Sequence, residues 1–314
     1  KVESYSDPQR VLAGAALRHG RLTARLAANP GWHTVHTQVR VGELPQLRRW
    51  LVHVTDPAAV RKAAAQRPGK VTARSRWHCV DLAPVLNGDV RTIYSQEYLT
   101  PRTKTISVRL GTDGYSPWTF RYWNTALPKI QLDAVPGLLD SATGRLRTPA
   151  GVPFAWPGEA RNIAFTSHWD NWPDRVTVPV NAAGDAVWFL VCGSTNPMQN
   201  QVANAVLRLR YSTGPDDTLE LVPPHNYWNL CPIRPGIAAP GQESRSDYTD
   251  AVDAFCVPKP WPQTVQLGEN CRAMVLGRRL RKGAVLKSVT LETLSPEVVV
   301  GLMGISVQAS GSRR

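Results

Sequence analysis

The chain has 314 residues and a mass of 34.6 kDa, enough for two average domains or one large β architecture, each with its own apolar core. Apolar residues make up 42% of it, but the longest uninterrupted apolar run, 186–192, is far shorter than the roughly 20 residues that cross a bilayer. These values exclude a disulfide-stapled miniprotein, and no membrane partner is expected.

Charged residues are only 19% of the chain, whereas Pro (26), Gly (23) and Trp (11) are plentiful, as is typical of short strands joined by tight turns. The formal charge is +13, and residues 1–78 hold 14 Lys and Arg against four Asp and Glu. A basic surface of this kind attracts polyanions, although a simply solvated Arg-rich surface is the alternative. Nucleic acid is not expected as a partner, because no zinc-finger spacing or RNP-like aromatic motif accompanies the charge.

The first quarter of the chain predicts a helix over 8–20 and a hairpin of two strands over 21–28 and 32–42. A strand over 47–55, a short helix over 58–66 and another strand over 70–82 follow. The hairpin is predicted from period-two alternation and from the Asn-Pro-Gly turn at 29–31. Asp56 and Pro57 mark the start of the short helix, since Asp caps a helix and Pro suits its first position.

Turn signals then recur every 8–15 residues between runs of β-forming residues, at 103–110, 161–167, 175–180, 185–193, 202–211, 217–222, 263–267, 272–277, 284–293 and 297–308. Without intervening long helices, this spacing predicts a mostly β chain built as an antiparallel β-sandwich, of jelly-roll or galactose-binding-like type. We expect two lobes, a basic one over 1–135 with the short helix and a sandwich over 136–314. The Pro-rich stretch 223–262 is predicted to be a long surface loop.

Five cysteines are present and form no Cys-x-x-Cys pair, so a structural zinc site is not expected. Cys192 is predicted to be a buried strand residue, and Cys231 and Cys256 would close the Pro-rich loop as a disulfide in an exported protein. The chain starts at Lys1 without an initiator Met, which we interpret as a processed protein or a piece of a longer one.

Several motifs occur in a characteristic order. They are Gln-Glu-Tyr-Leu-Thr-Pro-Arg (96–102), Thr-Pro-Ala-Gly-Val-Pro-Phe (148–154), Phe-Thr-Ser-His-Trp-Asp-Asn-Trp-Pro-Asp (165–174), Gly-Ser-Thr-Asn-Pro-Met-Gln (193–199), Asn-Tyr-Trp (226–228) and Glu-Val-Val-Val-Gly-Leu-Met (297–303). This order resembles the C-terminal part of the domain-of-unknown-function family 4450, which consists of large secreted proteins of polysaccharide-degrading bacteria. It also resembles the accessory β-sandwiches of multi-domain glycoside hydrolases.

The resemblance covers roughly residues 77–308, and 232–246 looks expanded relative to the family pattern. It implies a secreted or periplasmic, carbohydrate-associated protein whose partners are a polysaccharide or oligosaccharide, together with an upstream catalytic domain or further copies of the chain.

Sugar recognition needs flat apolar faces for the C–H side of a pyranose and planar polar groups for its hydroxyls. The candidate ligand-binding residues combine these two kinds of side chain: Trp169, Asp170, Asn171, Trp172, Trp118, Trp156, Asn226 and Trp228. The alternative is structural, because loop Trp residues often cap a sandwich core and Asp or Asn turns often hydrogen-bond their own backbone.

Glycoside hydrolysis needs two carboxyl groups that face each other across a cleft, and Asp170, Asp174 and Glu97 are the candidate catalytic residues. No cofactor or metal site is predicted. Calcium remains an alternative because of Asp247, Asp250 and Asp253, which lack the frame of an EF-hand loop. Nucleophile-elbow, phosphate-loop, zinc-protease and dinucleotide motifs are absent from the sequence.

The sequence therefore predicts a carbohydrate-associated β-sandwich region of a secreted polysaccharide-processing protein, which binds glycan or supports a catalytic domain. Two alternatives stay open. One is a free-standing glycoside hydrolase that uses a carboxylate pair, and the other is a secreted structural or assembly subunit.

Overall fold

The computed structural model describes residues 4–6, 12–26, 29–41, 43–54, 56–93, 99, 130–132, 138–140, 142–156, 158, 160–195, 199, 201–230, 263–268, 271–296 and 298–309. The chain divides into two compact units. The first comprises Lys1–Ala65, and the second comprises Gln66–Ala251 and Pro258–Arg314. This division lies earlier in the chain than the boundary expected at residues 135 and 136.

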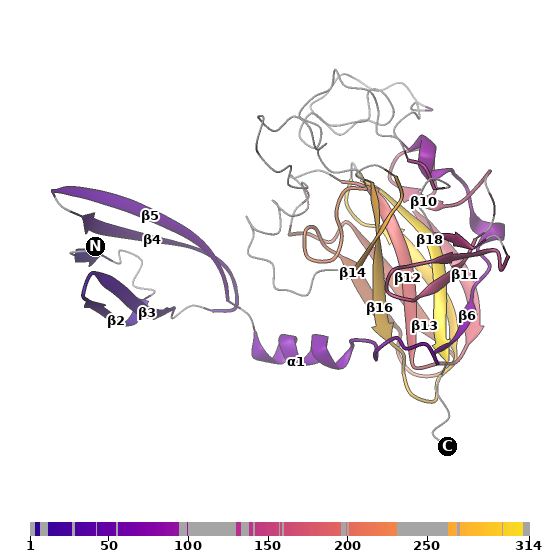
Figure 1. The fold of residues 1–314 in the computed structure, drawn as a ribbon, viewed down its shortest axis with the longest axis horizontal. Coiled ribbons are helices and arrows are strands. Elements are labelled where there is room, and N and C mark those ends of the chain that lie inside the picture. Colours follow the sequence, from indigo (N-terminus) through magenta and orange to yellow (C-terminus); the bar gives the residue numbers. More distant parts are fainter. Residues whose placement is uncertain are drawn as a thin grey trace. The chain divides into compact units, whose positions relative to one another are not determined.

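The first unit contains a three-stranded antiparallel sheet, a separate hairpin and one α-helix (Figure 1). The sheet has the order β1-β4-β5, the hairpin pairs β2 with β3, and the elements are β1 (Ser4–Ser6), β2 (Leu12–Arg18), β3 (Arg21–Leu26), β4 (Gly31–Val41), β5 (Leu44–Val54) and α1 (Pro57–Ala65). The predicted helix at 58–66 is confirmed, and Oδ1 of Asp56 caps it by accepting a hydrogen bond from the Ala58 N–H at 2.8 Å.

Two other predictions for this unit are wrong. Within the helix expected over 8–20, the described residues 12–20 form a strand and a turn, because β2 pairs with β3 and Gly14 and Gly20 adopt positive φ angles that interrupt a helix. The hairpin expected between 21–28 and 32–42 does not form, because β4 pairs with β5 along its whole length instead.

Two antiparallel sheets form the framework of the second unit. The six-stranded sheet has the order β10-β18-β12-β16-β15, and β6 also pairs with β18. Its strands are β6 (Arg76–Cys79), β10 (Ala164–Ser167), β12 (Ala186–Ser194), β15 (Gln263–Gln266), β16 (Arg272–Arg279) and β18 (Val299–Ala309). The four-stranded sheet has the order β11-β17-β13-β14, with strands β11 (Arg175–Ala182), β13 (Ala205–Tyr211), β14 (Asp217–Leu221) and β17 (Leu286–Thr293).

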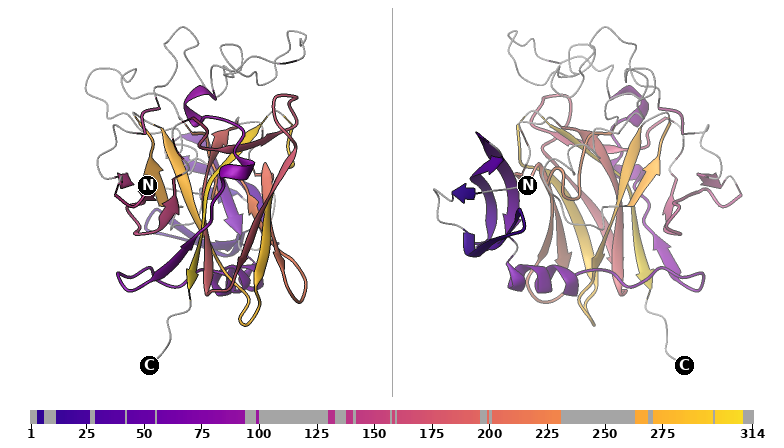
Figure 2. Two further views of the ribbon diagram at one scale, coloured as in Figure 1. Left: turned by 90° about the vertical axis from the view of Figure 1, so that its right-hand side faces the viewer. Right: turned by 60° about the vertical axis from the view of Figure 1, so that its left-hand side comes forward.

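The two sheets lie face to face as two layers (Figure 2, left). The hydroxyls of Thr166 in β10 and Thr293 in β17 join the layers by a hydrogen bond of 2.7 Å. Burial alternates along β11, so the four-stranded sheet buries one face and exposes the other. Every residue of β12 is buried, so at this strand the six-stranded sheet is covered on both faces, as its long apolar run requires.

A third layer covers the other face of the six-stranded sheet. It includes the small sheet of β7 (Leu139–Asp140), β8 (Arg145–Arg147) and β9 (Pro153–Ala155), and the short 3-10 helix η2 (Val90–Thr92), which follows η1 (Ala83–Val85). Phe154 of β9 is fully buried in one cluster with Trp188 and Leu190 of β12. A Cβ at Gly304 of β18 would lie 2.6 Å from the Phe154 ring, so only glycine fits this close approach.

The expectation of a mostly β chain with antiparallel sheets and one short α-helix is confirmed for the described residues. The nine strands expected between 161 and 308 correspond to β10 through β18, whereas the strand expected at 103–110 lies outside the described residues. Of the strand expected at 70–82, only β6 forms. None of the described helices is long and apolar enough to span a bilayer.

Cys79 and Cys192 are free thiols, and Cys271 takes part in a disulfide. Burial alone raises the pKa of Cys192, as expected of a buried strand residue. Cys231 and Cys256 lie outside the described residues.

Candidate functional site

Four strands, β10, β12, β14 and β17, end at the same end of the two facing sheets, which we call the loop end. The connections that meet there are 168–174, 195–204, the start of 222–262 and 294–298. Backbone hydrogen bonds join them, because Gln201 N–H donates to Pro223 O and Leu294 N–H donates to Asn204 O, both at 2.9 Å. The topology thus brings the two Trp-containing motifs, at 168–174 and 226–228, to one end of the unit.

The 168–174 connection presents one of its two tryptophans partly to solvent and buries the other. Trp169 is only 3% exposed and belongs to the core cluster of the six-stranded sheet. Trp172 is half-buried, and its ring centroid lies 4.7 Å from that of Phe165 in β10. The Trp172 N–H also donates to Trp169 O at 3.3 Å, which fixes the turn. Trp169 therefore packs in the core, and Trp172 keeps part of a well-supported ring accessible.

Polar side chains of the same connection accompany Trp172. Asp170 is exposed and Asn171 is half-buried. Asp174 is also exposed and forms a long ion pair of 3.5 Å with its neighbour Arg175. Asp170 thus remains near Trp172 in the chain as a polar group that a ligand could reach, whereas Oδ1 of Asn171 is buried.

The 226–228 motif is largely used by the protein itself. Oδ1 of Asn226 accepts a hydrogen bond from Val222 N–H, and its Nδ2 donates to Glu220 O, both at 2.8 Å. Trp228 is only 2% exposed. Both ends of the Asn226 amide are therefore engaged in shaping the turn, and Trp228 is a core residue rather than a stacking surface.

Of the remaining sequence candidates, only Trp156 lies within the described residues. Trp156 is half-buried and packs beside β9 against the core cluster. Glu97, Trp118 and the three aspartates 247, 250 and 253 lie outside the described residues. Among the described residues, no group of three or more His, Cys, Asp and Glu is placed to hold a metal ion.

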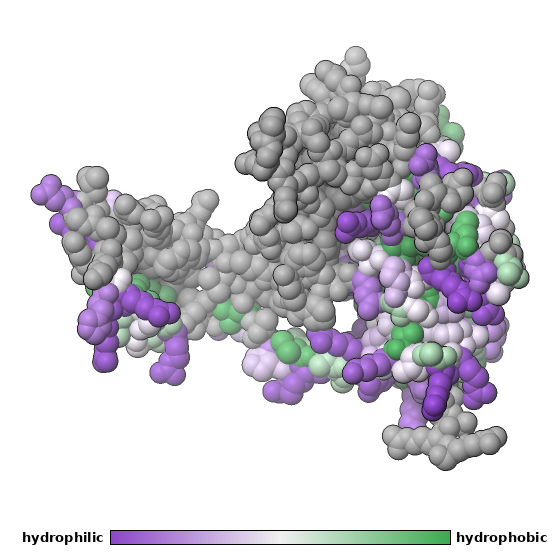
Figure 3. All heavy atoms as spheres, viewed as in Figure 1, coloured by the Kyte–Doolittle hydropathy of each residue, from purple (hydrophilic) through white to green (hydrophobic). Residues whose placement is uncertain are grey.

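Apolar side chains also reach the surface at the loop end. Val202 is 48% exposed and Leu294 is 41% exposed, and the backbone of Leu294 is bonded to the 195–204 connection at Asn204. In the view of Figure 3, by contrast, hydrophilic residues dominate the described surface and hydrophobic ones are scattered among them. The loop end therefore combines exposed apolar side chains with Asp170, Asn171 and Trp172.

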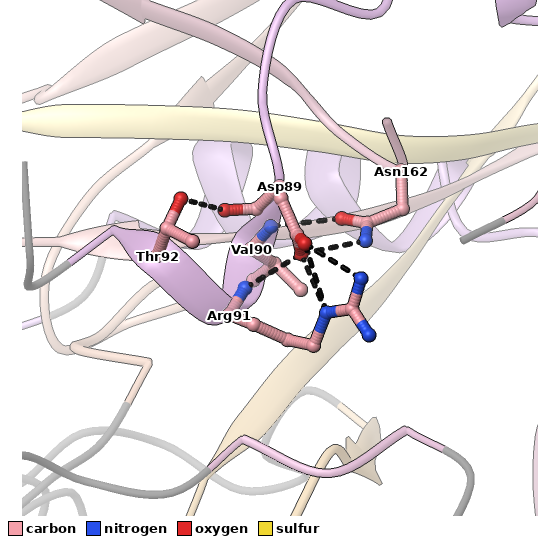
Figure 4. Close-up of polar contacts among 5 residues, drawn as sticks. All are labelled: Asp89, Val90, Arg91, Thr92 and Asn162. Atoms are coloured by element: carbon pink, nitrogen blue, oxygen red, sulfur yellow. Dashed lines mark hydrogen bonds and ion pairs between the residues drawn. The ribbon is translucent and has the colours of Figure 1, made fainter. Parts of the chain in front are cut away.

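A buried polar cluster that the sequence analysis missed supports this end of the sheet (Figure 4). Asn162 is fully buried and bonds in two directions at 2.8 Å, because its Oδ1 accepts from Val90 N–H and its Nδ2 donates to Oδ1 of Asp89. Arg91 donates its backbone N–H and its guanidinium to the same Asp89 carboxylate, at 2.7 to 3.0 Å. The only sequence signal for this cluster is Asp89 in the capping position before η2.

The electrostatics of Asp89 follow from these bonds. Burial by itself would raise the pKa of Asp89, but the hydrogen bonds from the Arg91 side chain and backbone and from Asn162 outweigh it and hold the pKa below its ordinary value. Asp89 is therefore an ionised structural group rather than a proton donor.

The segment before Asp89 extends the six-stranded sheet beyond β10. The Asn87 side chain bonds both ways to the Phe165 backbone, at 2.8 and 2.9 Å, and Gly88 forms a bridge with Ile163. A Cβ at Gly88 would overlap the Phe165 ring and would lie 3.7 Å from Nε1 of Trp172. This added segment therefore fixes Phe165, the residue on which Trp172 rests.

Comparison of the chain with protein-family models, with curated proteins and with solved structures finds no match. The loop end must therefore be interpreted from its own residues.

Proposed function

We propose that the second unit is a jelly-roll β-sandwich of a secreted or periplasmic polysaccharide-processing protein, and that its loop end binds glycan or holds a catalytic domain that acts on glycan. The observation that carries the proposal is the half-buried Trp172, which packs on Phe165 and comes two residues after the exposed Asp170 in the same connection. A supported indole beside planar polar groups is the arrangement that a sugar ring requires.

The strand order supports the jelly-roll assignment. If β10, β11, β12, β13, β14, β16, β17 and β18 are numbered one to eight, they follow the order 1-8-3-6 in one sheet and 2-7-4-5 in the other. Two facing antiparallel sheets of eight strands in this order form a jelly roll, a fold that lectin domains share with capsid proteins and cupins. Because a fold hosts many functions, the glycan assignment depends on the residues of the loop end.

The disulfide of Cys271 supports export of the protein. Disulfides persist in oxidising compartments and are rare in the cytosol of most organisms. Cys271 is fully buried between β15 and β16, where a disulfide is protected from reductants.

Retention on immobilised polysaccharides tests the proposal. We expect the purified chain to be retained on at least one neutral polysaccharide in both low and high salt, because stacking and hydroxyl hydrogen bonds are little screened by ions. Trp172→Leu and Asp170→Asn should each weaken retention about tenfold or more, whereas Asp216→Asn, an exposed aspartate in the turn between β13 and β14, should not.

The same samples separate the alternatives when they are assayed for reducing ends. Sugar release would indicate a glycoside hydrolase. Retention that Trp172→Leu and Asp170→Asn leave intact would contradict a binding role of the loop end. Absence of retention together with self-association would favour the assembly subunit.

A further inference from the structure

The end of the second unit opposite the loop end holds a cationic group that lacks a hydrogen-bond acceptor. The connections 183–185, 212–216 and 280–285 meet there. Arg281 and Asp217 form an ion pair at this end, with Nη2 of Arg281 3.0 Å from Oδ1 of Asp217. The guanidinium of Arg281 also lies over the Tyr211 ring, 5.1 Å from its centroid, and the Tyr211 hydroxyl donates to Oδ2 of Asp217 at 3.1 Å.

These bonds leave the Asp217 carboxylate fully engaged. Burial would raise the pKa of Asp217, but the hydrogen bonds from Arg281 and Tyr211 and the nearby positive charges outweigh it and lower the pKa. Burial and the Asp217 charge raise the pKa of Tyr211 to about 12, so this residue is neutral at physiological pH. Asp217 therefore supplies one negative charge, which Arg281 neutralises, and the neighbouring Asp216 also acts electrostatically on Arg281.

Arg278 is a second guanidinium beside this pair. It is the cross-strand neighbour of Val187, and strand alternation places both side chains on the face of the six-stranded sheet that looks toward the four-stranded sheet. Arg278 is half-buried and interacts electrostatically with Asp217 and Tyr211. Its Nε is buried without a hydrogen-bond partner, and no ion pair of its guanidinium occurs within the described residues.

The burial of Arg278 is therefore compensated only in part, because Asp217 acts on its charge from a distance but accepts no hydrogen bond from it. A half-buried charge without an acceptor is destabilising unless a counter-charge reaches it. Of the Arg278 guanidinium nitrogens, only Nε is both buried and without a partner, and the residue is partly exposed. The terminal nitrogens can therefore contact a counter-charge that comes from solvent. Nη1 of Arg281 is a second donor that Asp217 does not use.

We propose that Arg278, assisted by Arg281, binds one anionic group at this end, namely the carboxylate or sulfate ester of an acidic sugar. A planar guanidinium with free terminal nitrogens suits both oxyanions. That the anionic group belongs to a sugar rests on the proposed function. The anion site itself rests only on the surroundings of Arg278. It lies at the opposite end from Trp172, so an acidic glycan would meet a second contact beyond the loop end.

Thermal unfolding tests the site without a polysaccharide. The probes are glucose, sodium glucuronate and sodium glucose 6-sulfate at one ionic strength. We expect the two anionic sugars, but not glucose, to raise the Tm of the wild-type chain by about 2–4 °C at concentrations several-fold above Kd. A shift with only one of them identifies the carboxylate or the sulfate ester as the bound group.

Two variants make the test specific. Arg278→Met keeps much of the side-chain volume and should abolish the shift while leaving the Tm without ligand equal or higher, because no ion pair is lost. Arg272→Gln, an exposed arginine at the other end of β16, should keep the full shift. The site is refuted if neither anion shifts the wild type, if Arg278→Met still responds, or if that variant unfolds at a markedly lower temperature without ligand. If the wild-type chain shows the anion-dependent shift but is not retained on any neutral polysaccharide, the proposed function is refuted and the anion site is not.

Discussion

At the scale of single residues, Asp89 shows how a half-buried carboxylate can stabilise the fold. Its carboxylate receives hydrogen bonds from the Asn162 amide, the Arg91 backbone and the Arg91 guanidinium. Satisfied in this way, it anchors the segment that adds to β10 and supports Phe165 under Trp172.

Asp89→Asn should therefore destabilise the second unit in a pH-dependent way. The folded-state pKa of Asp89 is lowered, so its contribution is fully present above the unfolded value of about 4 and is lost as the pH falls through the folded value. We expect the variant to be less stable than wild type by about 1–3 kcal/mol at pH 7, and the difference to narrow below about pH 4. Urea unfolding at pH 7 and pH 3 measures both values. Asp170→Asn, at an exposed aspartate, serves as the control, and a difference that stays constant with pH would argue against the ionised form as the stabilising one.

The sequence located the connections between strands better than it showed which of their residues are buried. The sequence correctly marked 168–174 as a connection between strands, but it could not separate Trp169 from Trp172. Their exposure depends on the third layer, which buries the second face of the six-stranded sheet and draws Trp169 into the core. That layer includes residues about 15 to 80 positions away in the chain, such as Phe154 and Val90, and local pattern carries no information about it.

At the scale of elements, the pairing of β12 with β18 depends on a glycine. A Cβ at Gly193 would overlap the carbonyl oxygen of Val299 and the hydroxyl of Tyr227. That hydroxyl donates to the same carbonyl at 3.3 Å, so the two strands and the 222–230 segment share one contact.

Gly193→Ala should consequently lower the free energy of unfolding by about 1–3 kcal/mol, because the strands must separate to admit the methyl group. Gly69→Ala provides a matched control, since a Cβ at Gly69 meets nothing within 4 Å, and it should stay within about 0.5 kcal/mol of wild type. Chemical denaturation of the three proteins gives the comparison. Equal stability of the two variants would show that β12 and β18 tolerate a wider separation.

Strands were predicted well where apolar residues alternate along them or form a continuous run. They were predicted poorly where two pairings of the strands suit the sequence equally. The apolar run in β12 and the alternation in β11 identify their strands directly. The hairpin expected between 21–28 and 32–42 does not form, because β3 pairs with β2 and β4 pairs with β5, and the alternation within each strand does not show which partner it takes.

At the scale of the whole molecule, the disulfide of Cys271 predicts a thiol count. With five cysteines and one disulfide, the unfolded, unreduced chain should react as three free thiols with a thiol reagent, and as five after reduction. Reduction should also lower stability by about 2–5 kcal/mol, as for other native disulfides. A count of five without reductant would show that the bond does not form, and would remove the support that it gives to export.

The first unit carries a high density of positive charge, because Lys1–Ala65 has ten Lys and Arg against four Asp and Glu. Within its β2–β3 hairpin, Arg18 lies directly opposite Arg21, and Arg25 follows on the same face as Arg21. Like charges opposite each other repel, so a polyanion that lies along this face would relieve the repulsion and release its own counterions.

Replacing Arg18, Arg21 and Arg25 by Ser in the full chain should therefore weaken retention on acidic polysaccharides at low salt and flatten its dependence on salt. Retention on neutral polysaccharides at high salt should not change, because the loop end supplies it. The matched control replaces Arg161, Arg272 and Arg279, three exposed arginines of the second unit, by Ser. If that control lowers acidic retention as much as the hairpin variant does, net charge alone governs the interaction and the arrangement of arginines on the hairpin has no special role.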